Sequence, residues 1–81
     1  MNIPNIGDIY HHFKGHIVEI VCVAKDSETL TEMVIYKHTE TGEYWSRPLE
    51  MFNEELDPQK YPNASQKTRF VLLKSESSKK S

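Results

Sequence analysis

Residues 16–24, with the sequence HIVEIVCVA, form the clearest β-strand pattern in the chain and decide its fold class. Along a strand, successive side chains point to opposite faces of the sheet. One face then carries Val18, Ile20, Cys22 and Ala24, and the other carries Ile17, Glu19, Val21 and Val23. Because both sets are mostly apolar, we expect both faces to be covered, as in a central strand.

Outward from this strand, the pattern predicts one strand before it and three after it. Residues 7–13 alternate in the same way, with Tyr10 and His12 on one face. Gly15 follows in a short turn, where glycine can take the positive φ that a tight hairpin requires. Further strands are expected at residues 32–39, 44–47 and 69–74.

A short helical turn is expected between the last two strands. Pro48 has no N–H to donate, so strand pairing should stop there. Leu49 and Phe52 lie three residues apart, which suits one turn of helix within residues 48–55. The irregular segment 57–67 then leads to the last strand.

Five strands and one helical turn predict an all-β protein. The five Val, six Ile and five Thr outnumber the two Ala and five Leu, which favours strands over helices. Short strands of this kind close into a small five-stranded barrel, SH3-like or OB-like, of which we favour the SH3-like form. We expect a single barrel domain at residues 1–74 and a disordered polar tail at residues 75–81.

Composition excludes several classes of protein. An 81-residue chain with 37% hydrophobic residues is one small domain, and the lone Cys22 cannot form an internal disulfide. A signal peptide and an apolar run long enough to span a membrane are both missing, so we expect a cytoplasmic monomer or weak dimer. The net charge of −2 argues against a strongly basic nucleic-acid binder.

Aromatic and charged side chains on several expected strands form the candidate binding site. If the barrel brings these strands to one side, they make a stacking surface for a peptide or a small anionic ligand. In this hypothesis Lys14 and Arg47 bind the anion and Glu28 orients Arg47. The candidate residues are Tyr10, His12, Lys14, Glu28, Tyr36, Trp45 and Arg47.

Two structural interpretations stand beside this hypothesis. In a domain with few large side chains, Tyr36 and Trp45 can be core residues. A carboxylate at Glu28 can brace Arg47 or Lys14 at a bend without binding any ligand. The site hypothesis requires the candidate residues to be exposed together.

Metal binding and catalysis find little support in the sequence. Neighbouring His11 and His12 point to opposite faces of a strand, and no Cys or His pair has the spacing of a zinc site. We therefore expect no metal or other cofactor, and Cys22 is interpreted as a small core residue. His12 and Glu28 could act as an acid–base pair in a small hydrolase, but this is the less favoured alternative. We therefore favour a non-enzymatic binding module.

Single-stranded RNA or DNA is the stronger alternative ligand. Small barrels present aromatic strands to nucleic acids. Basic side chains could form a stripe for the phosphates, although twelve acidic residues and a pI of about 6.0 weaken that attraction. The basic residues in question are Lys14, Lys37, Arg47, Lys67, Arg69 and Lys74.

Several blocks of mixed chemistry also follow one another in order: Gly7, Tyr10, His12, Phe13, Lys14 and Gly15; Ala24, Ser27, Glu28 and Thr29; Met33, Val34 and Tyr36; Trp45, Arg47, Pro48, Leu49, Met51, Phe52 and Glu54; Arg69 and Phe70. Together they resemble the pattern of the bacterial family called domain of unknown function 1653. The chain departs from that pattern at Asp26, where members often have His. The resemblance implies a bacterial, cytoplasmic, single-domain β protein and brings no established activity.

Overall fold

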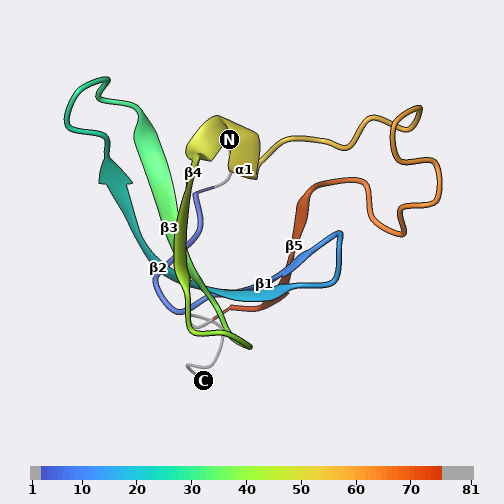
Figure 1. Cartoon of the computed structure of the whole chain (residues 1–81), viewed down its shortest axis with the longest axis horizontal. Coiled ribbons are helices and arrows are strands. Elements are labelled where there is room, and N and C mark those ends of the chain that lie inside the picture. The colour runs from blue at the N-terminus through green and yellow to red at the C-terminus, as the bar shows by residue number, and fades with distance from the viewer. Residues whose placement is uncertain (1–2, 76–81) are drawn as a thin grey trace.

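A computed structural model describes residues 3–75 of the chain, and five strands and one short helix make up its regular structure (Figure 1). In chain order these elements are β1 (Ile9–His12), β2 (Ile17–Lys25), β3 (Glu32–His38), β4 (Tyr44–Pro48), α1 (Leu49–Phe52) and β5 (Phe70–Lys74). The predicted strands and helical turn are therefore confirmed. The tail expected at residues 75–81 lies outside the described residues except for Ser75.

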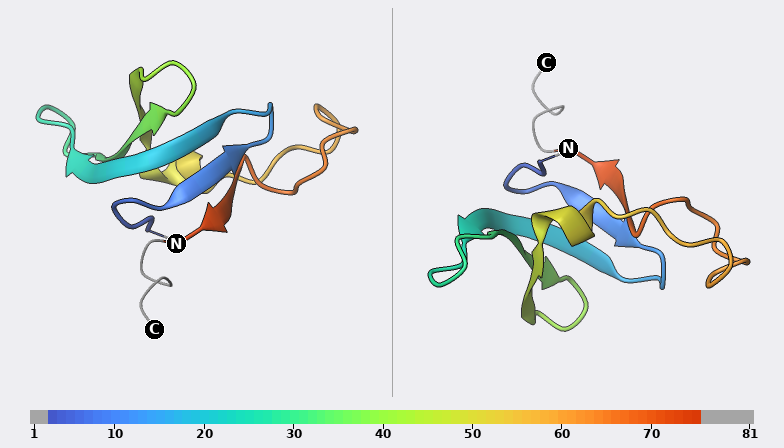
Figure 2. Two further views of the ribbon diagram at one scale, coloured as in Figure 1. Left: turned by 90° about the horizontal axis from the view of Figure 1, so that it is seen from below. Right: turned by 90° about the horizontal axis from the view of Figure 1, so that it is seen from above.

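The strands form one antiparallel sheet in the order β4-β3-β2-β1-β5. The sheet is strongly curved, and α1 lies over its inner face (Figures 1 and 2). The prediction of a closed SH3-like barrel is wrong, because β4 and β5 stay as two open edges in the described part of the chain. Strand count and pattern do not determine closure, which depends on how far each strand bends.

A β-bulge in β2 changes which side chains face the core. The register with β3 shifts between Ile20 and Cys22, so one extra residue is inserted at Val21. Beyond the bulge the alternation is reversed: Val23 packs against the core, and Ala24 is exposed. The two faces expected for residues 16–24 are therefore correct only as far as Ile20.

The core lies between the inner face of the sheet and α1. Phe52 of α1 is 2% exposed and stacks on Phe70 of β5, with ring centroids 4.3 Å apart. Tyr10 of β1 meets Phe52 edge-on at 5.0 Å. The buried apolar residues are Tyr10, Val18, Ile20, Val34, Tyr36, Leu49, Phe52 and Phe70. Aromatic rings thus make up half of this small core, and they fix α1 on the sheet.

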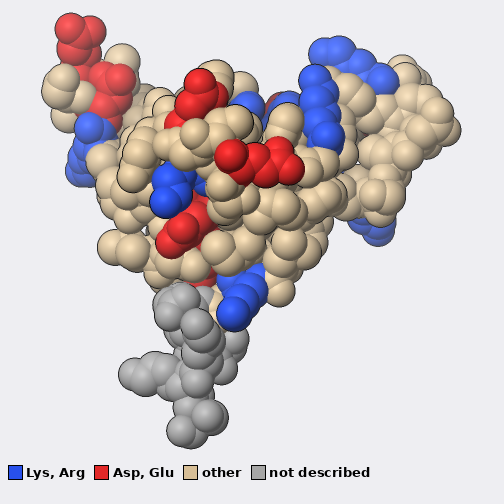
Figure 3. All heavy atoms as spheres, turned by 60° about the horizontal axis from the view of Figure 1, so that its bottom comes forward, with Lys and Arg blue, Asp and Glu red and all other residues tan. Residues whose placement is uncertain are grey.

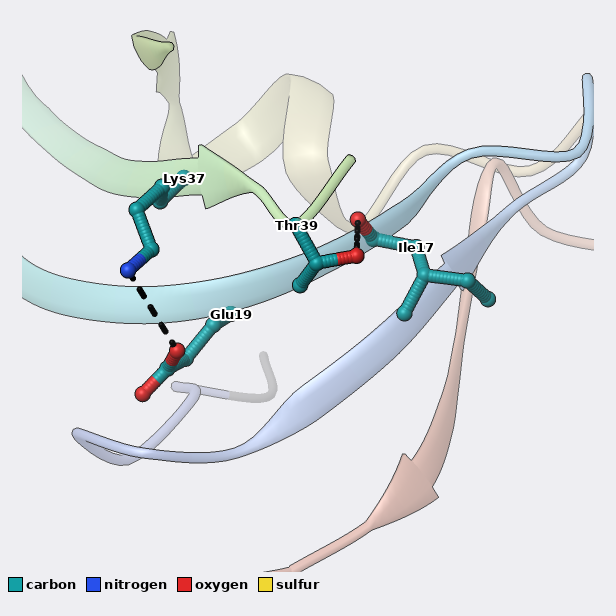
Figure 4. Close-up of polar contacts among 4 residues, drawn as sticks. All are labelled: Ile17, Glu19, Lys37 and Thr39. Atoms are coloured by element: carbon teal, nitrogen blue, oxygen red, sulfur yellow. Dashed lines mark hydrogen bonds and ion pairs between the residues drawn. The ribbon is translucent and has the colours of Figure 1, made fainter. Parts of the chain in front are cut away.

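Charges of both signs are interspersed on the face drawn in Figure 3. On β2 and β3, the register partners Glu19 and Lys37 form an ion pair at 4.0 Å (Figure 4). The Thr39 hydroxyl donates a hydrogen bond of 3.1 Å to the carbonyl of Ile17 beside this pair. Both ion-pair side chains are over a third exposed, so this contact adds little to stability.

The described part of the chain contains no helix that is long and apolar enough to cross a membrane.

Candidate functional site

A shallow pocket of about 200 Å³ lies where β1 and β3 end and β4 begins. Four of its lining residues belong to the predicted site, and two further histidines complete it. The lining residues are His12, His16, Tyr36, His38, Trp45 and Arg47. We call this site the Arg47 pocket.

Strand register explains why these side chains meet. Trp45 lies directly opposite Tyr36 in the antiparallel pair of β3 and β4, so both side chains lie on the same face. Arg47 and His38 follow two residues after Trp45 and Tyr36, respectively, and alternation keeps them on that face. His12 joins them from the end of β1.

The rings of the pocket form a nearly continuous row. His12 lies 5.8 Å from His16, which lies 5.0 Å from His38. His38 is in turn 5.5 Å from Trp45 and 5.9 Å from Tyr36, stacked on the latter. Trp45 is 49% exposed, so a ligand can reach its indole ring.

Arg47 has a cation–π partner but no carboxylate. Its guanidinium carbon lies 5.8 Å from the centroid of Phe70, and its Nε is buried and donates no hydrogen bond. Arg69 also lies over an aromatic ring, that of Phe13, and its Nε is likewise buried, but its Nη2 pairs with Glu54 at 3.0 Å. Among residues 3–75, no acidic side chain forms an ion pair with Arg47 or lines its pocket. The fold therefore leaves the positive charge of Arg47 without a negative partner.

His12 is held neutral beside this charge. It is 8% exposed, and burial together with the nearby charges of Arg47 and Arg69 lowers the pKa of His12 from 6.5 to about 4. The backbone N–H of Lys14 donates a hydrogen bond of 3.1 Å to His12 Nδ1. A neutral imidazole that accepts through Nδ1 carries its proton on Nε2, so His12 is a hydrogen-bond donor at that atom.

Three predicted site residues lie elsewhere. Tyr10 is 3% exposed and belongs to the core. Lys14 is exposed in the β1–β2 turn, with its Nζ 5.8 Å from the ring of Phe13. Glu28 is exposed in the bend between β2 and β3, and it forms no ion pair with Arg47 or Lys14 in the described part of the chain. The expected brace between Glu28 and a basic residue is therefore not formed.

The bend that carries Glu28 is organised by Asp26 instead. One carboxylate oxygen of Asp26 accepts backbone N–H groups from Glu28 at 2.8 Å and from Thr29 at 3.0 Å. The hydrogen bonds from Thr29 and Glu28 lower the pKa of Asp26. The acidic residue at this position thus has a local structural role that needs no ligand.

Joint exposure, which the site hypothesis required, holds only in part. Tyr36 is 4% exposed and His12 is buried, so these two form the floor of the pocket, whereas Trp45 and half-buried Arg47 are accessible. His16 and His38 were not among the predicted site residues. His38 could have been found by alternation from Tyr36, whereas His16 lies in a turn whose geometry the sequence does not define.

Two other kinds of site, a metal site and a larger hollow, are weaker candidates within the described part of the chain. Within residues 3–75, no three His, Cys, Asp or Glu side chains are arranged to hold a metal ion. A larger hollow of about 530 Å³ lies within the irregular segment 55–67, but its charged residues, Glu55 and Lys67, are of opposite sign and are both exposed. The Arg47 pocket is the better candidate because its polar groups converge.

Comparison with known proteins identifies a family and no individual relative. No curated protein and no solved structure matches the chain. A family model described as a protein of unknown function, DUF1653, matches residues 8–72. This range contains every strand except the end of β5, together with the whole Arg47 pocket. The chain therefore belongs to the DUF1653 family of proteins of unknown function.

Proposed function

We propose that this protein is a non-enzymatic binding module that accepts an anionic group of a peptide or small ligand in the Arg47 pocket. The observation that carries the proposal is the charge of Arg47, which forms no ion pair among residues 3–75. Three histidines and no acidic side chain of the described residues line its pocket. A partly buried cation without a counter-charge favours binding of an anion. A planar guanidinium also matches the geometry of a carboxylate or a phosphate.

Arg47, His12 and Trp45 have distinct roles in this proposal. Arg47 neutralises the anion, and Nε2 of neutral His12 donates a hydrogen bond to it. The exposed indole of Trp45 stacks on a flat part of the ligand, because aromatic faces stack on many different groups. Phe70 lies beneath the pocket, 4.9 Å from His12 and 5.6 Å from Tyr36, and holds these rings in place.

Benzoate is a suitable first probe, since it combines a carboxylate with one aromatic ring. Trp45 is the only tryptophan of the chain, so its fluorescence reports directly on the pocket. We expect Arg47→Gln to weaken benzoate binding roughly 10- to 100-fold, because a charged hydrogen bond contributes about 1.5–3 kcal/mol. Benzamide, which is neutral and nearly the same shape, should bind as weakly as benzoate binds to the variant.

Lys14→Gln is the matched control for this experiment. It removes one positive charge two residues after His12, but the Lys14 side chain lies outside the pocket. We expect the control to bind benzoate within about twofold of the wild type, because an exposed charge is screened by solvent. Equal affinity for benzoate and benzamide, or full binding by Arg47→Gln, would refute the anion site.

Single-stranded nucleic acid stays a prediction for the same aromatic surface. Binding to phosphates would show a steep dependence on salt, because it releases counterions. An oligonucleotide that quenches Trp45 at low salt, when benzoate does not, would favour this alternative. A cytoplasmic location and a monomeric or weakly dimeric state likewise stay predictions, and a small hydrolase stays the less favoured alternative.

A further inference from the structure

The open edge of β4 lies directly beside the Arg47 pocket. β4 is the last strand of the sheet on that side, so it pairs with β3 alone. Three successive residues of this strand, Tyr44, Trp45 and Ser46, are exposed. In Figure 2 the β3–β4 hairpin projects from the rest of the sheet. An edge of this kind presents free backbone groups that can pair with another strand.

The pairing with β3 defines which backbone groups of β4 are free. The N–H of His38 donates to the carbonyl of Glu43 at 2.9 Å, so these two opposite residues form a hydrogen-bonded pair. Such pairs alternate along an antiparallel ladder, which directs the backbone groups of Trp45 and Arg47 toward β3. The N–H and C=O groups of Tyr44 and Ser46 then point outward. Pro48, which has no N–H, ends the free edge.

A strand added to this edge would present side chains to the pocket. Residues opposite each other in an antiparallel pair lie on the same face of the sheet. Side chains opposite Trp45 and Arg47 would therefore lie over the inner face, where the Arg47 pocket opens. Two such positions are separated by one residue, whose side chain would lie on the outer face.

We propose that the β4 edge binds an extended segment of a partner protein as a sixth, antiparallel strand, with acidic residues at alternate positions. This inference rests on the proposed function, because the acidic side chains would occupy the Arg47 pocket. Charge complementarity favours an acidic partner: among residues 3–75, Arg47 forms no ion pair and no acidic side chain lines its pocket. An antiparallel arrangement continues the pattern of the whole sheet and is the more stable pairing per residue.

The opposite edge, β5, carries no comparable information. Val71, Leu72 and Leu73 are exposed there, and Lys74 is the charged residue at the end of the strand. Among the described residues, no charged side chain lines the hollow of about 340 Å³ beside this edge, so nothing there indicates the chemistry of a partner. The choice of β4 therefore depends on the pocket beside it, and not on exposure alone.

The geometry gives a precise test with synthetic peptides. The probe is a seven-residue peptide of alternating Thr and Glu, acetylated and amidated at its ends. With Glu over the inner face, the Thr N–H groups point toward β4 and the Glu N–H groups point away. N-methylation of the Thr residues should therefore weaken binding at least tenfold, whereas N-methylation of the Glu residues should leave it within about threefold. Any other pattern would overturn the proposed pairing.

Variants of the protein separate this inference from the proposed function. Ser46→Pro removes an outward N–H that β3 does not use, so it should weaken peptide binding at least tenfold and leave benzoate binding unchanged. Arg47→Gln should weaken binding of both probes. If benzoate binds as expected but the methylation pattern is missing, the strand proposal fails and the anion site stands. If benzoate does not bind, the proposed function fails first.

The oligomeric state is the remaining arm of the test. Sedimentation equilibrium of the free protein should show that Ser46→Pro does not change its molar mass. A dimer that this substitution dissociates would overturn the proposal, because a second copy of the chain would then occupy the β4 edge. The peptide of alternating Thr and Gln is the final control and should bind at least tenfold more weakly than the Glu peptide.

Discussion

Acidification should destabilise this protein through one buried histidine. The pKa of His12 is lowered from 6.5 to about 4, mainly by burial and then by the charge of Arg47. Between these two values the unfolded chain binds a proton at His12 that the folded chain does not. The stability supplied by neutral His12 is therefore complete at neutral pH and is lost as the pH falls from 6.5 toward 4.

The size of this effect follows from the two pKa values. The difference between 6.5 and about 4, at about 1.4 kcal/mol for each pH unit, gives about 3.5 kcal/mol. A domain of 81 residues has a free energy of unfolding of about 4–12 kcal/mol. Protonation of His12 alone would thus remove a quarter or more of the stability.

Urea denaturation at several pH values between 7.5 and 4.5, followed by far-UV circular dichroism, measures this loss. His12→Asn is the informative variant, because its amide oxygen can still accept the Lys14 N–H while it cannot titrate. We expect the variant to be less stable at pH 7.5, since it lacks the ring that contacts Phe70 edge-on. The free energy of unfolding of the variant should also fall less steeply as the pH is lowered. The difference between its slope and that of the wild type should be about 1 kcal/mol per pH unit.

His11→Asn is the matched control, one residue earlier in β1 and on the opposite face. It retains His12 and should retain the wild-type pH dependence. The reasoning would be refuted if His12→Asn and the wild type lost stability in parallel between pH 6.5 and 4.5. In that case the acid sensitivity would come from other groups.

Two further predictions concern packing and backbone conformation. Phe52→Ala should lower the free energy of unfolding by about 3–5 kcal/mol, because Phe52 is 2% exposed and stacks on Phe70. The neighbouring exposed Met51→Ala should change it by less than about 0.5 kcal/mol, and similar losses in both would contradict the assigned core. Leu30→Gly should raise the stability by roughly 0.5–1 kcal/mol in the same urea assay, because Leu30 has a positive φ of 61° and is 68% exposed. Glu40→Gly is the control, at an exposed turn position without a positive φ, and should be slightly destabilising. If it raised the free energy of unfolding as much as Leu30→Gly does, relief of backbone strain would not be the cause.

The sequence predicted the elements of this fold well and their closure poorly. Alternation and turn residues located all five strands and the helical turn within a few residues. The bulge at Val21 was not predictable, because an apolar residue there fits either face of a strand. Whether the edges at β4 and β5 meet depends on the total curvature of the sheet. No local sequence pattern determines that total.

Four of the seven predicted site residues line the Arg47 pocket, and burial explains why Tyr10 does not. Asp8, Tyr10 and His12 of the first strand look like a solvent face in the sequence, yet all three are buried. Their polar atoms have partners within the fold, such as the Asn5 N–H on the Asp8 carboxylate at 3.0 Å. Sequence alternation identifies two faces but does not say which of them is inside when both contain aromatic and polar residues.

The pairing of β1 with β5 has a consequence for how the protein is made. Tyr10 lies opposite Leu72, so the first and last strands pair although most of the chain separates them in sequence. Phe70 is part of the last strand, β5. While β5 is still inside the ribosome, the nascent chain lacks the Phe70 ring that lies beneath His12, Tyr36 and Arg47. Pairing over so long a sequence separation is slow, because loop closure precedes any gain in contacts. The Arg47 pocket should therefore be complete only after translation of the last strand, in the same step that completes the sheet.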